Sequence, residues 1–366
     1  AFRVLHILSQ RPGRTGSGIT LDSLVREAAA AGRVQRALVG VPHDEVHPSV
    51  GGLPPEHVAR VTFGTIGPQA DLPFPVPGMS DVMPYPSTVW STLGPDDLAR
   101  YRVVWKERIS QLAKDFRPDV IHTNHVWLMS SLIPDSAPGV PVVCACHATG
   151  LRQMQLCPHL RDEVLGGCRR IDRFVVLRED HREQLAEVLG IDLSRIAVTG
   201  AGYREDLFRP GPAGARDPDA LLYVGKYSEA KGLPWLLDAV ERMEPGVHLH
   251  VAGAGAGPEA DALRRRMERM PDRVTLHGML DQPALADLMR RCRACVLPSF
   301  YEGVPLVLVE AAACGCRIVA TELPGVRERI APALGSWLET VPLPRLETVD
   351  RPVADALPAF TADRAA

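Results

Sequence analysis

The chain has no uninterrupted apolar run of the roughly 18 residues that a membrane-spanning helix needs. Its start, AFRVLHILSQ, has a short apolar core and no small-residue cleavage site, so it is unlike a secretory signal peptide. Positive charge is not in excess, because 41 Lys and Arg stand against 44 Asp and Glu. Nucleic-acid-binding proteins normally have a basic surface. We therefore expect a cytoplasmic protein with no nucleic-acid partner and no stable membrane insertion.

Aromatic residues are also scarce, at 5% of the chain, but 46% of the 366 residues are hydrophobic and 23% are charged. A chain of this length can bury a full core, and a domain usually contains about 100–200 residues. The composition therefore predicts a soluble globular protein of two domains.

The sequence gives no reason to expect disulfides, since no export signal is visible. Six of the eight cysteines form close pairs: Cys144 with Cys146, Cys292 with Cys295, and Cys314 with Cys316. A CxxC followed by a CxC resembles the spacing of zinc ligands. The same cysteines lie in predicted buried strands and beside an Ala-rich helix, where core thiols are common. We favour buried thiols and expect no metal site.

Short continuous apolar runs alternate with amphipathic helical patterns, as in proteins with buried parallel strands. The first series of predicted strands comprises FRVLHIL, DVIHTNH, VPVVCACH and RFVVL. The second series comprises ALLYVGKY, VHLHVAG, RVTLHG, ACVLPS and RIVAT. The aperiodic segment TGAGYREDLFRPGPAGARDPDA separates the two series. We predict an α/β protein with domains at 1–205 and 206–366, an irregular tail, and a ligand cleft between the domains.

Residues 42–95 are rich in proline and have too little periodicity for a helix. Long loops in compact domains are usually lids, substrate-binding walls or mobile segments. We expect a low-order loop here, with a wall for an acceptor molecule as its role.

Two glycine-rich segments each follow a predicted strand. In SQRPGRTGSGITLDS, Gly16 and Gly18 would let a phosphate approach the start of a helix. A tight strand-to-helix turn without a ligand is an equal alternative, because neither the Walker pattern nor the dinucleotide fingerprint is complete. In VAGAGAGPE, Pro258 stands where the dinucleotide fingerprint requires glycine. We expect no nicotinamide cofactor.

The segment SFYEGVPLVLVEAAAC places one glutamate in a turn and another inside a buried helix. Pro305 suits the first position of that helix, whose free amide groups would bind a diphosphate. Glu310, further into the helix, would then reach the ribose of the same nucleotide, and Glu302 would face the other end of the ligand. The alternative for Glu310 is a buried acid paired with an arginine.

Two lysines are predicted beside this phosphate site. Lys226 and Lys231 follow a strand of the same domain in the segment GKYSEAKG, together with Gly225. Ammonium groups there would stabilise a departing diphosphate. Either lysine alone would more commonly be a surface residue.

The segments GKYSEAKG, SFYEGVPLVLVEAAACG and CACHATGLRQ together resemble the retaining GT-B glycosyltransferases of family 4, whose signature is Glu, seven residues, Glu. The resemblance covers residues 1 to about 330 and is stronger in the second half. It implies two Rossmann-like domains whose parallel sheets face each other across a cleft. The first domain would bind the acceptor, and the second would bind a nucleotide-sugar donor.

The resemblance also implies roles for individual residues. Glu310 would hold the ribose, Lys226 and Lys231 the diphosphate, and His147 would contact the transferred sugar. The donor sugar would be held by Glu302 and the backbone of Gly303, Val304, Pro305, Leu306 and Val307. The diphosphate would also be approached by Gly16, Gly18 and Gly225. A lone histidine such as His147 is otherwise more commonly structural.

Some positions depart from the family pattern. Lys226 stands where arginine is commoner, so a bidentate grip on phosphate is lost. In TGAGYREDLF, Ala201 and Arg204 replace the Asn and Asp of the family's interdomain segment.

The implied function is a metal-independent, retaining hexosyltransferase without a cofactor, in which the nucleotide sugar is a co-substrate. His147, Lys231 and Glu302 are the predicted catalytic residues. UDP is the favoured donor nucleotide because it is the commonest one among such enzymes, and a small hydroxylated molecule, such as a natural product or a cell-surface precursor, is the expected acceptor. A noncatalytic sugar-nucleotide binding subunit, or an epimerase or hydrolase on the same scaffold, remains the alternative.

Overall fold

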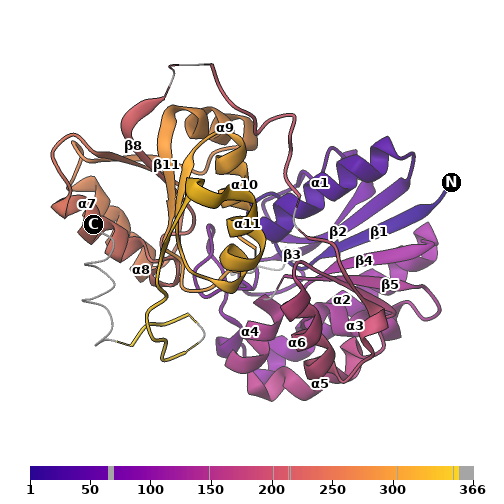
Figure 1. Ribbon diagram of the computed structural model, residues 1–366. Helices are drawn as coiled ribbons and strands as arrows, with labels where there is room; N and C mark the ends of the chain where they lie inside the picture. The colour runs from indigo at the N-terminus through magenta and orange to yellow at the C-terminus, as the bar shows by residue number, and fades with distance from the viewer. Residues whose placement is uncertain are drawn as a thin grey trace. The chain divides into compact units, whose positions relative to one another are not determined.

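The computed structural model describes residues 1–64, 70–147, 149–200, 202–212, 214, 216–302, 304–348 and 350–353. The chain divides into two compact units (Figure 1). Unit 1 comprises Ala1–Asp81 and Pro86–Gly200, and unit 2 comprises Val82–Tyr85 and Ala201–Ala366. The sequence placed the junction after residue 205, and it did not predict that residues 82–85 belong with the second half.

Unit 1 contains a parallel sheet of seven strands in the order β3-β2-β1-β4-β5-β6-β7. Its strands are β1 (Arg3–Leu8), β2 (Val34–Pro42), β3 (Val58–Phe63), β4 (Val120–Asn124), β5 (Val142–Cys146), β6 (Arg173–Val176) and β7 (Ile196–Val198). Its α-helices are α1 (Gly16–Ala30), α2 (Pro95–Phe116), α3 (Leu128–Ser136), α4 (Thr149–Leu156), α5 (Pro158–Cys168) and α6 (Glu179–Leu189). Right-handed crossovers place α1 on one face of the sheet and α2, α3, α5 and α6 on the other.

Both faces of this sheet are packed. Leu21 and Val25 of α1 lie against Val39 and Val41 of β2 without solvent exposure. On the other face α2 contributes Tyr101 and Trp105, which join an aromatic cluster with Trp90. A sheet covered on both sides explains why its strands are continuously apolar.

Within 42–95 the structure describes residues 42–64 and 70–95, and the prediction of a low-order loop is wrong for part of them. Strand β3 lies inside it and pairs in parallel with β2. Three of its six residues, Val58, Val61 and Thr62, are β-branched, but the prolines on both sides concealed the strand in the sequence pattern. Beyond β3, Leu72 and Thr88 form isolated bridges to Phe63 and Pro77.

Unit 2 contains a parallel sheet of six strands in the order β10-β9-β8-β11-β12-β13. Its strands are β8 (Asp217–Val224), β9 (His248–Ala252), β10 (Val274–Gly278), β11 (Cys292–Leu297), β12 (Arg317–Thr321) and β13 (Leu338–Val341). Its α-helices are α7 (Leu233–Arg242), α8 (Pro258–Glu268), α9 (Gln282–Arg291), α10 (Leu306–Ala313) and α11 (Ala331–Leu334). The two parallel sheets confirm the predicted α/β class.

The core of unit 2 lies in two layers. Leu237 of α7 and Met267 of α8 pack with Val251 on one face of the sheet. On the other face Leu308 of α10 and Met289 of α9 form the second cluster. All eight cysteines of the chain are buried thiols, as the sequence predicted.

The described part of the tail, residues 342–348 and 350–353, contains one isolated bridge between Leu346 and Pro352. The rest of the predicted irregular tail lies outside the described residues. Within the part of the chain that the structure covers, no helix combines the length and apolarity needed to cross a bilayer.

Candidate functional site

Parallel α/β sheets bind ligands beyond the carboxyl ends of their strands, where the strand order reverses. In unit 1 this point lies between β1 and β4. Gln10 follows β1 and His125 follows β4, and His125 Nε2 lies 3.1 Å from Gln10 Oε1. Both side chains are buried. A polar bridge therefore spans the reversal point of the first sheet.

His147 follows β5, beside this bridge, and its side chain is half-buried. Its Nε2 lies 2.9 Å from Asn124 Oδ1, and its ring centroid lies 5.0 Å from that of His125. Burial lowers the pKa of His147 from 6.5 to about 4, so the imidazole is neutral at pH 7. A neutral imidazole can exchange hydrogen bonds with a sugar hydroxyl without adding charge.

The predicted glycines of unit 1 lie at the start of α1. Thr15 caps this helix, and its hydroxyl accepts a hydrogen bond from Gly18 N at 3.3 Å. A Cβ on Gly18 would lie 2.7 Å from Gly13 N, whereas a Cβ on Gly16 would meet nothing within 4 Å. Packing alone accounts for Gly18. Gly16 has no packing reason to be glycine, and it is the better candidate for close approach by a ligand.

Replacing Gly16 and Gly18 separately by alanine should give opposite results. Gly18→Ala should lower the melting temperature, because the new methyl group clashes with backbone. Gly16→Ala should leave the melting temperature unchanged or slightly higher, since alanine favours helix by up to about 1 kcal/mol. If a diphosphate contacts this backbone, Gly16→Ala should still raise the KM for the donor. An unchanged donor KM in the Gly16 variant would remove this loop from the site.

In unit 2 the strand order reverses between β8 and β11, and the two predicted charged loops follow these strands. Lys231 Nζ donates to Glu302 Oε1 at 2.5 Å. The side chains are 21% and 19% exposed, so solvent screens the pair only in part. Ser299 Oγ donates to the same oxygen at 3.0 Å. Among the described residues, Oε2 of Glu302 has no hydrogen-bond partner.

Backbone contacts hold these two loops together. Phe300 N donates to Ala230 O at 3.0 Å. Gly232 has φ +67°, and a Cβ there would lie 2.0 Å from Pro298 O. Glycine is therefore required beside Lys231, both for its backbone conformation and for the close approach of the second loop.

Gly225 and Lys226 lie at the end of β8, beside the same reversal point. Gly225 N donates to Ala252 O, and Lys226 O accepts from Tyr223 Oη at 2.6 Å. Lys226 Nζ lies 3.5 Å from Met83 Sδ. The structure places Gly225 and Lys226 beside the Lys231 loop.

Helix α10 begins at Leu306, one residue later than predicted, with Pro305 as its N-cap. A proline has no side chain that can cap, and the first amide groups are left for other acceptors. Val304, Leu306 and Val307 are half-buried at this end of the helix. Gly303, predicted to bind the sugar with its backbone, lies outside the described residues.

Glu310 lies one turn into α10, about 6 Å along the axis from Leu306. Its side chain is only 8% exposed. Burial raises its pKa from 4.5 to about 7. Among the described residues no arginine or other group forms a hydrogen bond or ion pair with this carboxylate, so the alternative of a structural pair gains no support. A buried carboxylate without a partner is costly, and binding a ligand hydroxyl would offset that cost.

Removing the charge of Lys231 and that of Glu302 in separate variants should affect different steps, donor binding in the first and turnover in the second. Lys231→Ala should weaken nucleotide-diphosphate binding by about 10–100-fold, the loss of one charged hydrogen bond. Glu302→Gln should reduce kcat by a similar factor without weakening that binding, because it removes a negative charge near the phosphates. The control is Glu163→Gln, which breaks the exposed Arg102 pair in unit 1 and should change neither. Equal, small effects of the Lys231 and Glu302 changes would contradict the assignment.

Sequence reasoning missed the residues that support these groups. Gln10, Asn124 and His125 support the predicted site residue of unit 1, and Tyr223 and Ser299 support those of unit 2. Polar residues directly after apolar strands, as in HTNH and LPS, were the available signal. Their partners are far away in sequence and could not be assigned.

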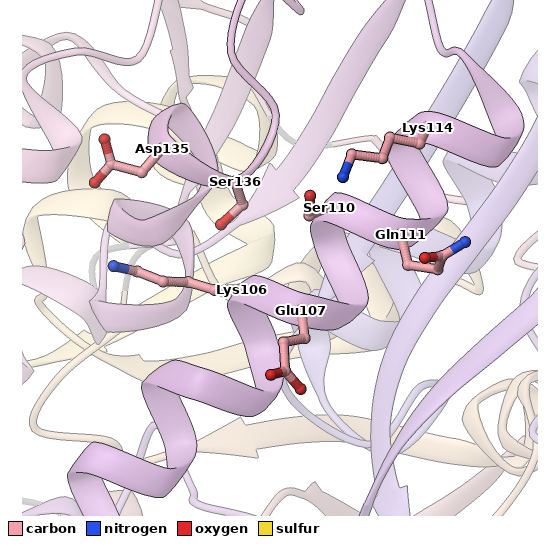
Figure 2. A pocket seen from close by; sticks show the side chains of 7 residues that line it. All are labelled: Lys106, Glu107, Ser110, Gln111, Lys114, Asp135 and Ser136. Carbon is pink, nitrogen blue, oxygen red and sulfur yellow. The ribbon is translucent and has the colours of Figure 1, made fainter.

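A shallow groove of about 480 Å³ lies elsewhere on unit 1. Figure 2 shows Lys106, Ser110 and Lys114 on α2 facing Asp135 and Ser136 at the end of α3. Helices of such folds run antiparallel to the strands, so the C-terminal ends of α2 and α3 lie at the amino edge of the sheet. None of the predicted site residues lines this groove, and we do not assign it to the site.

Both parts of the chain match known protein families. Residues 61–206 match Glycosyltransferase Family 4, and residues 218–339 match the glycosyl transferases group 1. The chain belongs to glycosyltransferase family 4.

Relatives of this family 4 chain include enzymes with different names. A glycogen synthase of Mycobacterium tuberculosis (strain ATCC 25618 / H37Rv) is 31% identical over 61% of this chain and 57% of its own length. The chain thus spans little more than half of that relative. A D-inositol 3-phosphate glycosyltransferase 2 of Catenulispora acidiphila is 28% identical over 76% of this chain and 72% of its own length.

Solved structures show the same fold as this family 4 chain. Sucrose-phosphate synthase from Thermosynechococcus elongatus has a TM-score of 0.70 and 20% identity, covering 100% of this chain and 91% of its own. HepE of Anabaena in complex with UDP-glucose has a TM-score of 0.65 and 18% identity, covering 93% and 86%. The chain has the GT-B fold, as the sequence predicted.

Proposed function

We propose that this family 4 chain is a retaining glycosyltransferase, which moves a sugar from a nucleotide-diphosphate donor to a small hydroxylated acceptor. The observation that carries the proposal is in unit 2. The Lys231–Glu302 pair lies at the reversal point of the sheet, and the helix that follows contains the unpartnered, buried Glu310. These are a cation for phosphate, a carboxylate oxygen for a sugar and a carboxylate for a ribose.

The reaction exchanges one bond at the anomeric carbon. The bond from that carbon to the β-phosphate oxygen breaks, and the acceptor oxygen bonds to the carbon on the same face. The acceptor proton passes to the departing phosphate oxygen, so no protein nucleophile is required. Catalysis rests on positioning and on electrostatic stabilisation of the leaving group.

Each residue has a defined part in this scheme. Lys231 stabilises the charge of the departing diphosphate, and the free N–H groups at the start of α10 add to it. Glu302 Oε2 accepts a hydrogen bond from a sugar hydroxyl, while Oε1 keeps the hydrogen bonds donated by Lys231 and Ser299. In unit 1, His147 contacts the transferred sugar as a neutral group.

The donor is identified by a panel of UDP-, GDP-, ADP- and dTDP-sugars, with a UDP-sugar expected to bind. Binding raises the free energy of unfolding by RT ln(1 + [L]/Kd), or about 2.7 kcal/mol at 100 Kd. Stabilisation by one donor, followed by transfer of its sugar to an added acceptor, is the expected result. Binding without any transfer or hydrolysis would favour a noncatalytic subunit.

Transfer should proceed without a divalent metal. Lys231 and the α10 amide groups supply the positive field that a metal ion would otherwise supply. We expect the initial rate to be unchanged after treatment with EDTA. A rate abolished by EDTA and restored by Mn²⁺ would contradict this prediction.

A further inference from the structure

Asn124 ends strand β4 and is 1% exposed. Its amide oxygen lies 2.9 Å from Nε2 of His147. We propose that Asn124 is a positioning residue, which keeps the imidazole proton of His147 on Nε2 and presents the unprotonated Nδ1 to a hydroxyl group of the transferred sugar. This inference rests on the proposed function for the sugar, but the tautomer can be measured without any substrate.

The orientation of the Asn124 amide follows from its second contact. Its Nδ2 lies 3.4 Å from the carbonyl oxygen of Ile7 on the neighbouring strand β1. Reversing the amide would place two carbonyl-type oxygens opposite each other, without a proton between them. The amide nitrogen therefore faces Ile7, and the amide oxygen faces His147.

This orientation fixes the tautomer of His147. An amide oxygen can only accept a hydrogen bond, so Nε2 of His147 must donate it. The neighbouring imidazoles are His125, whose ring centroid lies 5.0 Å away, and His122 on β4, whose own pKa is lowered in part by the charge of His147. Burial lowers the pKa of His147 to about 4, and no carboxylate of the described residues contributes to that shift. The ring is neutral, and Nδ1 carries a lone pair.

His147 differs from the neighbouring His125 in having one ring nitrogen without a hydrogen-bond partner among the described residues. His125 Nε2 is bonded to Gln10 Oε1, and His125 Nδ1 lies 3.0 Å from the Thr149 hydroxyl. For His147 Nδ1, no described residue is a hydrogen-bond partner, and the residue as a whole is only half-buried. Of the two rings, only that of His147 has a nitrogen, Nδ1, that can accept a hydrogen bond from a ligand hydroxyl group.

A neutral acceptor suits the proposed chemistry. The sugar becomes positively charged at its anomeric carbon as the diphosphate departs. An imidazolium close to the sugar would oppose that charge, whereas an unprotonated nitrogen orients a sugar hydroxyl without opposing it. Asn124 contributes by excluding the tautomer in which Nδ1 carries the proton.

The first test uses long-range ¹H–¹⁵N spectra of protein labelled at histidine, with His147→Gln to assign the signal. The wild-type protein at pH 7.5 should show a protonated Nε2 and an unprotonated Nδ1 for His147. Asn124→Ala should give a mixture of tautomers. A proton on Nδ1 in the wild-type protein would overturn the proposal.

The second test separates a positioning role from a structural role. Asn124→Ala and Asn124→Asp both lose the amide donor to Ile7, but aspartate keeps an acceptor for Nε2–H. We expect kcat/KM to fall about tenfold at every pH in the alanine variant, the loss of one hydrogen bond. The aspartate variant should approach wild-type activity at high pH and lose it at lower pH, because a carboxylate raises the pKa of His147 by about 1 to 3.

Equal loss in both variants at all pH values would show that the bond to Ile7 matters and the tautomer does not. Asn124→Ser replaces the alanine variant if that variant does not fold. If no donor of the panel is turned over, the proposed function fails. The tautomer assignment is still decided by the spectra of the wild-type and Asn124 variants.

Discussion

Replacing Glu310 by glutamine is expected to weaken nucleotide binding by about 10–100-fold at pH 8, the loss of a charged hydrogen bond. The carboxylate is buried and has no protein partner among the described residues, so a ribose hydroxyl would be its strongest contact. Glutamine keeps the shape of the side chain but loses the charge. Calorimetric titration with the nucleotide diphosphate measures the change.

The same residue predicts a pH dependence. In the free protein the pKa of Glu310 is about 7, and ribose hydroxyls would stabilise its ionised form. Below pH 7 the ligand must therefore displace a proton, and affinity should fall by up to about tenfold per pH unit. Above pH 7 it should level off. The Glu310→Gln variant should lack this dependence, and a wild-type affinity that is flat from pH 5.5 to 8 would contradict the ribose assignment.

Replacing Gly232 by alanine is expected to have the largest effect on stability. The residue has φ +67°, where an L side chain costs about 1–2 kcal/mol, and its Cβ would lie 2.0 Å from Pro298 O. We expect unit 2 to lose more than about 2 kcal/mol of its free energy of unfolding. The loop with Lys231 should also move away from the loop with Glu302, which would reduce donor turnover.

Gly278→Ala is the matched control in the same unit. Gly278 has φ +64°, but a Cβ there would meet nothing within 4 Å. Gly278→Ala should lower the free energy of unfolding only by the cost of placing an L side chain in this backbone conformation, about 1–2 kcal/mol. Equal melting temperatures for the Gly232 and Gly278 variants would show that close packing on Pro298 does not hold the two loops together.

The charged groups of unit 2 were accessible from the sequence for a physical reason. Glu302 and Glu310 lie within one short strand-turn-helix segment, and Lys231 lies in another. The local sequence pattern was therefore enough to predict their positions. Their direct pairing could not be predicted, because Lys231 and Glu302 are 71 positions apart and meet only through the order of strands β8 and β11. Sequence periodicity does not encode that order.

Other features depended on tertiary packing. Strand β3 lies in a proline-rich segment, and its place in the sheet depends on its parallel pairing with β2. Residues 82–85 belong with unit 2, which no composition change indicates. His125 adopts φ 69°, a backbone conformation that is uncommon outside glycine, and the surrounding hydrogen bonds sustain it.

The most direct test of the central claim is the anomeric configuration of the product. In the proposed function a leaving diphosphate is held by the charged groups of unit 2, and the first glycine-rich segment, SQRPGRTGSGITLDS, contains no His and a single acidic residue, Asp22. Asp22 accepts a hydrogen bond from Gly51 N, which occupies it structurally. An inverting enzyme would need a general base opposite the leaving group. NMR of the product should show an α-linkage from an α-linked donor, and a β-linkage would contradict the retaining mechanism.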